Sequence, residues 1–350
     1  MPSLLEDEIR SQPAVVARLL ETQVPAIESL AAELLPFRFA LIAARGSSDH
    51  AALYAKYALG ALAGYPVALA APSLSTLYGA PPRLEGALVV GISQSGQSPD
   101  IVAVVEEGRR QGCPTLALTN DPGSPLAAAA GKVIDIGAGP ERSIAATKTY
   151  TAELVALAAL AACCSGEARL AHLTELRALP AALDAAVAAA FAAVPVDGEE
   201  LRALERVVVV GRGYNFATAS EIALKLKELT YGMAAAYSAA DFRHGPIATV
   251  EAGSPALLVM PGGRAYADML ALAGELRERE VELAVISEQP EALGLARLPL
   301  PLGGADAQTP EWLSPVTAVV PGQVLALRLA EAKGLAPDAP RGLRKVTRTV

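Results

Sequence analysis

Three serines and a glycine follow one apolar segment in a pattern that suits anion binding. Residues 87–92 predict a buried strand, and the run 93–98 (SQSGQS) precedes Pro99, which is well suited to the first turn of a helix. Such a turn directs free backbone N–H groups and the positive end of the helix toward one point. One serine could simply cap the helix, but three hydroxyls with an amide and a glycine favour an anion site. We predict that phosphate is bound by Ser93, Gln94, Ser95 and Ser98.

A second hydroxyl-rich turn follows the apolar run 39–44 and begins after Arg45. In an open parallel sheet a ligand lies beyond the carboxyl ends of the strands, so this turn should form another wall of the phosphate site. Its residues are Gly46, Ser47 and Ser48. An Arg-Gly step also precedes a helical pattern after the run 207–210, which indicates a degenerate internal duplication. After Met260 the chain reads PGGR without hydroxyls, so we expect only the first half to bind phosphate.

An acid and a base lie on one predicted helix in the second half of the chain. Lys225 and Glu228 are three residues apart and therefore share a helix face. Such spacing usually means a solvated salt bridge. Isomerisation of an aldose to a ketose, however, needs one carboxylate that carries a proton between neighbouring carbons and a cation that stabilises the enediolate. The pair fits that chemistry.

His244 is followed by Gly245-Pro246, which indicates a loop, whereas His50 and His172 lie on predicted helices. A lone histidine is more often a structural hydrogen-bonding group than a catalyst. A closed sugar ring must nevertheless open before it isomerises, and that step needs a group that moves a proton near neutral pH.

Apolar runs that alternate with helical patterns predict an α/β protein with doubly wound parallel sheets. The expected strands are 39–44, 87–92, 115–118 and 133–136 in the first half, and 207–210, 256–260, 282–286 and 298–301 in the second. We expect a first domain at 1–180 that includes N-terminal helices and the phosphate site, a second domain at 181–332, and an ordered C-terminal tail at 333–350 that closes the active site.

Composition narrows the function classes. The chain has 350 residues, 52% of them hydrophobic, which suffices for two cores. Its net charge of −8, with no basic stripe, argues against a nucleic-acid partner. Three cysteines, none in a metal-ligand spacing, are expected to be small buried side chains: Cys113, Cys163 and Cys164. No membrane-spanning run or signal peptide is recognised, so we expect a cytoplasmic protein without metal, cofactor or membrane partner.

The serine turn and the Arg45-Gly46-Ser47-Ser48 turn together resemble the sugar isomerase (SIS) domain family of phosphosugar binders. Their duplicated arrangement is similar to the isomerase part of glutamine–fructose-6-phosphate aminotransferase and its deaminase relatives. The resemblance covers nearly the whole chain and implies two tandem SIS domains, each a doubly wound parallel sheet flanked by helices.

The resemblance also implies roles for single residues. Glu228 would be the isomerisation base and Lys225 would contact the reacting end of the sugar. His244 would open the ring and would reach the site from the neighbouring subunit of a homodimer. Lys345 would approach the carbonyl carbon of the open sugar and form a Schiff base there. The sugar hydroxyls would be covered, mainly by backbone groups, by Ile144, Ala145 and Ala146.

Departures from the aminotransferase pattern favour a different reaction. Pro2 follows Met1 where the glutaminase domain has its nucleophilic cysteine, so we expect that this chain alone cannot draw ammonia from glutamine. Arg45 replaces a cysteine typical of the synthase, and Ala146 replaces a serine that touches the sugar. The Arg-Gly-Ser-Ser-Asp-His start is more similar to SIS-type deaminases.

We therefore expect a glucosamine-6-phosphate deaminase that binds a hexosamine or hexose phosphate and yields fructose-6-phosphate and ammonia. The alternatives are a transaminase-like isomerase supplied with ammonia and a deglycase for sugar-phosphate amine adducts. A sensor without catalysis is a further alternative, although SIS sensors usually pair one such domain with a helix-turn-helix, which is not recognised here.

Overall fold

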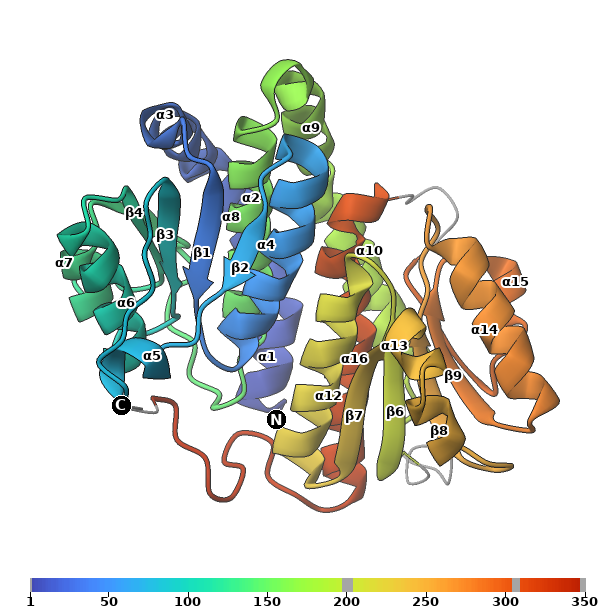
Figure 1. Ribbon diagram of the computed structural model, residues 1–350. Helices are drawn as coiled ribbons and strands as arrows, with labels where there is room; N and C mark the ends of the chain where they lie inside the picture. The colour runs from blue at the N-terminus through green and yellow to red at the C-terminus, as the bar shows by residue number, and fades with distance from the viewer. Residues whose placement is uncertain (1, 197–203, 304–308, 347–350) are drawn as a thin grey trace. The chain divides into compact units, whose positions relative to one another are not determined.

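The computed structural model describes residues 2–196, 204–303 and 309–346. The chain forms two compact units, each built around its own sheet (Figure 1). The first sheet unit comprises Ala14–Glu141, Lys148–Arg177 and Arg344–Val350, and the second comprises Met1–Pro13, Arg142–Thr147 and Ala178–Leu343. Each unit is made of several separate stretches of the chain. The continuous domains expected from the sequence, 1–180, 181–332 and 333–350, stay a prediction.

The first sheet has five parallel strands in the order β2-β1-β3-β4-β5. They are β1 (Phe39–Ala43), β2 (Val67–Leu69), β3 (Ala87–Ile92), β4 (Thr115–Thr119) and β5 (Lys132–Asp135). Strand β2 was not predicted, because it is a partly exposed edge strand of only three residues. The chain moves from β1 to one side and then returns to β3 on the other side. The strand order therefore reverses between β1 and β3, and ligands bind beyond such a reversal in parallel sheets.

The second sheet repeats this strand order as β7-β6-β8-β9-β10 and is also wholly parallel. Its strands are β6 (Arg206–Gly211), β7 (Met233–Ser238), β8 (Pro255–Val259), β9 (Glu282–Ser287) and β10 (Leu298–Pro301). The edge strand β7 was again missed by the sequence analysis. The α/β architecture with two parallel sheets is confirmed, whereas the internal duplication inferred from the Arg-Gly steps stays a prediction.

Helices flank the first sheet and form much of its core. They are α2 (Gln12–Thr22), α3 (Val24–Leu34), α4 (Ser47–Ala63), α5 (Ser73–Thr76), α6 (Pro99–Arg110), α7 (Pro125–Ala129), α8 (Lys148–Cys163) and α9 (Arg169–Leu176). Helix α8 is buried along its whole length and packs against α4 and α3. Small alanine side chains allow this close packing on all sides of the helix. Helix α6 begins at Pro99, as the sequence predicts.

The three cysteines differ in burial. Cys163 and Cys164 are buried at the end of α8, and burial raises the pKa of the Cys163 thiol to about 11 and that of Cys164 to about 12. Such thiols stay protonated and act as small apolar groups. Cys113 is only half-buried, so its expected full burial is wrong, and its thiol donates a hydrogen bond to the Leu84 carbonyl.

The second sheet is flanked by α1 (Leu4–Arg10), α10 (Leu179–Ala193), α12 (Asn215–Thr230), α13 (Ala239–Arg243), α14 (Tyr266–Glu278), α15 (Pro290–Leu293) and α16 (Ser314–Ala332). Two short 3-10 helices, η2 (Pro246–Thr249) and η3 (Glu311–Leu313), join them. Helices α12 and α16 pack closely at Gly322, where an added Cβ would lie 2.3 Å from the Ile222 side chain. This packing fixes the helix that carries the predicted acid–base pair.

Among the described residues, the stretch Glu311–Ala332 is long and apolar enough to cross a membrane, but 94% of its 18-residue apolar window is buried inside the protein. The bent pair Gly166–Leu176 and Leu179–Ala193 meets the same criterion only when both helices are counted together. A core helix meets this criterion as readily as a membrane span does, so the observation is weak evidence for a membrane.

The chain after α16 is ordered without forming a helix, as the sequence predicts for the described part of the tail. Asp338 accepts hydrogen bonds from the backbone N–H groups of Leu4 and Leu5 and so caps α1. Farther along, the Arg341 N–H donates to the Tyr231 hydroxyl, and the Arg341 guanidinium lies 4.1 Å from that ring centroid. These contacts hold the tail against the second sheet unit up to Leu343.

Candidate functional site

The serine turn between β3 and α6 is compact and depends on Gly96. This glycine has a φ of +61°, and an added Cβ would lie 2.1 Å from the Ser124 hydroxyl oxygen. The Ser93 hydroxyl accepts a hydrogen bond from the Gly96 N–H at 3.1 Å, and that of Ser95 accepts one from the Gln97 N–H at 3.3 Å. The carbonyl of Gln94 accepts the N–H of Asn120, which braces the turn against the chain after β4.

Ser98 occupies the N-cap position of α6, yet its side chain makes no capping hydrogen bond. The explanation that the serine serves as a simple cap therefore fails for Ser98. The amino end of α6 follows the serine turn directly, and in its first turn the buried Asp100 carboxylate accepts the Ile101 N–H. This geometry suits an anion at the turn.

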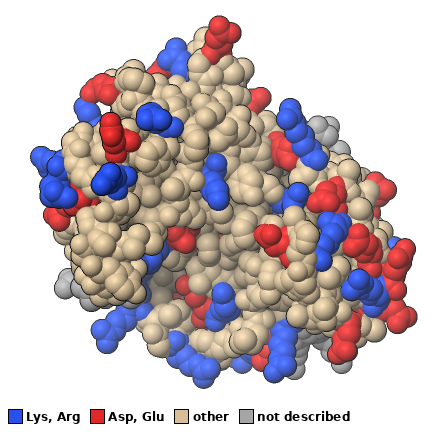
Figure 2. Space-filling model, viewed as in Figure 1, with Lys and Arg blue, Asp and Glu red and all other residues tan. Residues whose placement is uncertain are grey.

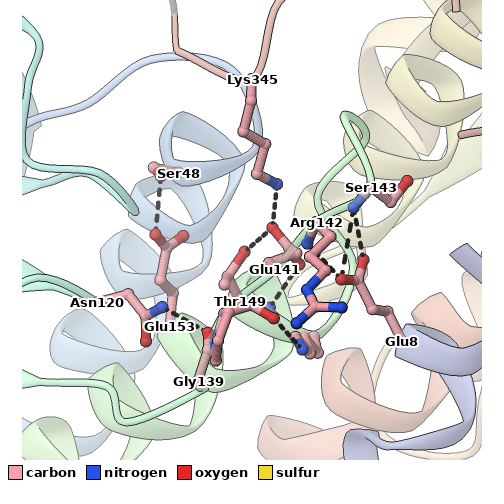
Figure 3. A network of polar contacts seen from close by, with 12 residues as sticks. Glu8, Ser48, Asn120, Gly139, Glu141, Arg142, Ser143, Thr149, Glu153 and Lys345 are labelled. Carbon is pink, nitrogen blue, oxygen red and sulfur yellow. Dashed lines mark hydrogen bonds and ion pairs between the residues drawn. The ribbon is translucent and has the colours of Figure 1, made fainter. Parts of the chain in front are cut away.

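The sheet brings the second predicted turn to the same edge. Strand β1 pairs with β3 in parallel, with Ala43 opposite Gly91, so the turns that follow the two strands are neighbours. Gly46 is the N-cap residue of α4 and has a φ of +56°, a conformation that favours glycine. Ser48 is buried and donates its hydroxyl hydrogen to Glu153 at 2.9 Å (Figure 3). A contact from Ser48 to phosphate must therefore use another group, such as its backbone N–H.

Arg45 and Asp100 form an ion pair that the sequence analysis did not find. Two guanidinium nitrogens of Arg45, Nε and Nη2, lie 3.0 and 2.9 Å from one carboxylate oxygen of Asp100. The Asp100 side chain is 1% exposed, whereas that of Arg45 is 50% exposed. The pair joins the end of the β1 turn to the first turn of α6 and leaves part of the guanidinium open to solvent.

The predicted acid–base pair on α12 is buried and has a third member. The Lys225 ammonium lies 2.5 Å from the Glu228 carboxylate and 3.4 Å from that of Glu221. The side chains of Lys225 and Glu221 are fully buried, but that of Glu228 is 23% exposed. The interpretation as a solvated surface salt bridge is therefore wrong. The i, i+4 spacing of Glu221 and Lys225 was the signal that would have revealed the third residue.

His244 lies in a turn directly after α13, so its predicted loop position is confirmed. The residue is exposed, and its backbone N–H donates to the carbonyl of Asp241. In the part of the chain that the structure describes, no hydrogen bond or ion pair joins His244 to Glu228. Both residues belong to the second sheet unit.

The loop with the predicted sugar-binding residues is anchored to α1. Glu8 is a buried carboxylate that accepts the Arg142 N–H at 2.5 Å and the Ser143 N–H at 3.3 Å (Figure 3). The loop continues through Ile144, Ala145 and Ala146, of which only Ala145 is buried. The sequence analysis missed Glu8, because nothing in an amphipathic N-terminal helix marks one of its carboxylates as buried.

Lys345 of the tail contacts the first sheet unit. Its ammonium lies 2.6 Å from the carboxylate of Glu141, a side chain with no exposed surface (Figure 3). Glu141 also accepts the backbone N–H and the hydroxyl of Thr149 near the start of α8. The ion pair with Glu141 therefore fixes the position of Lys345, for which only the family resemblance implied a Schiff-base role.

The predicted residues fall into two groups. The first sheet unit holds both turns of the predicted phosphate site together with Lys345, and the second holds Lys225, Glu228, His244 and the loop 144–146. Charges on the face drawn in Figure 2 are of both signs and intermixed, with no broad basic field. The predicted roles of the residues, and the expected absence of a nucleic-acid partner, stay predictions.

A cavity of about 170 Å³ lies elsewhere in the first sheet unit, beside β2 and α5. Its lining is apolar except for Ser75 and Glu107. A phosphate needs N–H, hydroxyl or cationic donors, so this cavity is unsuited to the predicted substrate.

Comparisons with known proteins agree with this geometry. A family model for the SIS domain matches residues 38–163 and 200–293. A glutamine–fructose-6-phosphate aminotransferase (isomerizing) of Gloeobacter violaceus is 35% identical over 353 aligned residues, which cover 97% of this chain and 57% of that protein. The chain thus spans little more than half the length of this relative.

Two solved structures are similar over nearly the whole chain. A protein of Silicibacter pomeroyi described as a phosphosugar isomerase has a TM-score of 0.84 and 34% identity, with 96% of this chain and 100% of that one covered. A glucosamine-6-phosphate deaminase of Thermotoga maritima has a TM-score of 0.79, with 99% of this chain and 100% of that one covered. Its identity of 22% supports the shared fold alone. Because the family model matches more than half of its residues, the chain belongs to the SIS domain family.

Proposed function

We propose that this protein is an aldose–ketose isomerase for amino-sugar phosphates that converts glucosamine-6-phosphate and water to fructose-6-phosphate and ammonia. The observation that carries the proposal is the arrangement on α12. Lys225 is buried between two carboxylates, and of these only Glu228 has exposed surface from which it can reach a substrate. A carboxylate oriented by a buried cation is the group that a proton transfer between adjacent carbons requires.

The phosphate would be bound at the serine turn by N–H and hydroxyl donors and by the amino end of α6. This arrangement explains how a chain of net charge −8 can bind a dianion. Arg45 would add one cation at the edge of the site, where Asp100 already fixes its direction. Binding through local dipoles needs no large basic surface.

The reaction would proceed in three steps. His244 moves a proton from the O1 hydroxyl to the ring oxygen, which opens the sugar to its aldehyde form. Glu228 takes the proton from C2 and returns it to C1, while one proton of the C2 amine passes to O1, so the aldehyde becomes an alcohol and the amine becomes an imine. Water then hydrolyses the imine and releases ammonia, with Lys345 able to replace the ammonia as a transient imine partner before water attacks.

We further propose a cytoplasmic homodimer in which His244 acts on the site of the neighbouring subunit. Its position in an exposed turn supports this assignment, because an exposed histidine can be supplied to another chain.

The decisive experiment measures ammonia release from glucosamine-6-phosphate, galactosamine-6-phosphate and fructoselysine-6-phosphate. Release from the first substrate, abolished in Glu228→Gln protein, is the expected result. Preference for fructoselysine-6-phosphate would identify a deglycase instead. Absence of turnover on all three, with sugar-phosphate binding intact by calorimetry, would favour the sensor alternative.

A second candidate reaction is the reverse direction, formation of glucosamine-6-phosphate from fructose-6-phosphate and supplied ammonia. It is favoured by the aminotransferase relative at 35% identity. Initial rates in both directions, measured with ammonium chloride in one and water alone in the other, would show which reaction this chain catalyses.

A further inference from the structure

Glu141 has an unusual position for a carboxylate, because it lies beside the mostly exposed segment 341–346. Its own side chain has no exposed surface, and it accepts at least three hydrogen bonds. Two come from Thr149, whose N–H lies 3.1 Å from one oxygen and whose hydroxyl lies 2.7 Å from the other. The third comes from the ammonium of Lys345, which is 204 residues away in the sequence.

The two donors of Thr149 make the contact with Lys345 reversible. A buried carboxylate that lost its only partner would be strongly destabilised. Glu141 keeps the hydroxyl and the N–H of Thr149 when Lys345 leaves, and the amino end of α8 adds a favourable dipole. The carboxylate is thus a docking point that tolerates both the presence and the absence of the lysine.

Lys345 lies in the segment 341–346, which has no helix or strand and is mostly exposed. A segment of this kind is poorly ordered unless specific contacts hold it. The Lys345 side chain is only 26% exposed, and Glu141 is its ion-pair partner within the described residues. One charge-assisted hydrogen bond therefore sets where the ammonium group lies before a substrate arrives.

We propose that Glu141 is the positioning residue for Lys345: it docks the segment that carries Lys345 in the substrate-free protein and holds the lysine until it attacks the C2 imine of the substrate. The inference rests on the proposed function for the second part of this role, because only there does Lys345 react with the substrate. Docking itself is a property of the free protein. Glu141 forms no bond to the substrate in this scheme.

Docking is tested by the reactivity of Lys345 toward acetic anhydride in the substrate-free protein, measured by mass spectrometry. Lys56, an exposed residue of α4, serves as the internal reference. We expect Glu141→Gln to raise acetylation of Lys345 relative to Lys56 by about tenfold, because the neutral amide loses the ion pair that keeps the Lys345 amine against the protein and away from the reagent. Thr149→Val, which leaves the Glu141 charge in place, should raise it much less. Equal reactivity of Lys345 in wild-type and Glu141→Gln protein would overturn the proposal.

A second measurement avoids any change at Glu141. Amide hydrogen exchange in the tail should stay slow in Lys345→Arg protein, which keeps the cation, and should become faster in Lys345→Met protein. If the two variants exchanged alike, the ion pair would not be what docks the tail.

Positioning is tested by a double-mutant cycle in kcat for ammonia release. We expect Glu141→Gln to lower kcat by about 10- to 100-fold with little change in KM, since only the placement of Lys345 is lost. Adding Glu141→Gln to Lys345→Met should then have no further effect. Additive losses would mean that Glu141 supports the fold rather than Lys345. If Lys345→Met alone kept full turnover, the imine step of the proposed function would fail, while the acetylation result would still decide the docking.

Discussion

The two sheets have the same strand order, yet the turns at their equivalent positions are completed in opposite ways. The turn after β3 presents serines at the amino end of α6, where the N-cap Ser98 makes no side-chain capping bond and Asp100 accepts the Ile101 N–H. The turn after β8 (residues 261–264) has no hydroxyls, and carboxylates of the chain itself occupy it. Glu311 accepts the N–H groups of Arg264 and Ala265 at 2.9 and 3.1 Å, and Glu288 accepts that of Gly262 at 2.7 Å.

The difference teaches that one topology can leave an anion site open or close it permanently. Gly263 is needed for the closure, because an added Cβ would lie 2.5 Å from the Glu311 side chain. A fixed carboxylate at a helix amino end stabilises it as a bound phosphate would, without a ligand. The first sheet unit thus holds the predicted binding turn, and the second holds the predicted acid–base helix.

The largest effect on turnover is expected from a change in the second sheet unit, at Glu228. Glutamine at position 228 keeps the shape of the side chain but cannot accept a proton. Glu228→Gln should therefore bind glucosamine-6-phosphate normally, while turnover falls by about 10²- to 10⁴-fold. Exchange of the C2 hydrogen with deuterated water, followed by NMR, should fall in parallel. Wild-type exchange in this variant would mean that the isomerase mechanism is wrong.

Subunit exchange tests whether His244 acts together with Glu228 of its own chain or with Glu228 of the neighbouring subunit. His244→Ala and Glu228→Gln proteins should each be inactive, and a one-to-one mixture should recover up to about a quarter of wild-type activity, because half of the dimers are mixed and each has one intact site. The mixture is assayed after mass spectrometry has shown that mixed dimers form. No recovery under those conditions would place His244 in its own chain's site or outside the mechanism.

Loss of the serine hydroxyls should weaken binding without changing the chemistry. The double substitution Ser93→Ala and Ser95→Ala is expected to lower the binding free energy of glucosamine-6-phosphate by about 1–3 kcal/mol, since the phosphate loses donors. Calorimetry measures the change, and unphosphorylated glucosamine serves as the control ligand. An unchanged affinity would remove the serine turn as the phosphate site.

The smallest expected effect concerns the closed turn. Glu311→Ala should lower the free energy of unfolding by about 1–2 kcal/mol, because the amino end of α14 loses its cap. Glu278→Ala, at the exposed opposite end of the same helix, should change it by less than about 0.5 kcal/mol. Denaturant titration gives both values. A loss of substrate affinity in Glu311→Ala protein as large as that of the serine variant would contradict the contrast between the turns.

Continuous apolar runs predicted the buried strands from the sequence, because central strands of a parallel sheet are covered on both faces. Strand β3 was predicted at its observed limits, and α6 began at Pro99 because proline suits the first helical position. The edge strands β2 and β7 are partly exposed and were missed, because β2 has only three residues and β7 is rich in alanine, which is uncommon in strands. The shared strand order of the two sheets appeared only in the structure.

The residue types and spacing of the serine turn and of the Lys225–Glu228 pair are local, so the sequence alone determined these candidates. Only the tertiary structure revealed the buried carboxylates that lie around the predicted site residues: Glu8, Asp100, Glu141, Glu153 and Glu221. A carboxylate is normally at the surface, and its burial becomes favourable only when donors from elsewhere in the chain surround it. Ser48 and Glu153 are 105 residues apart and Glu141 and Lys345 are 204 apart, so no local sequence pattern could indicate either pair.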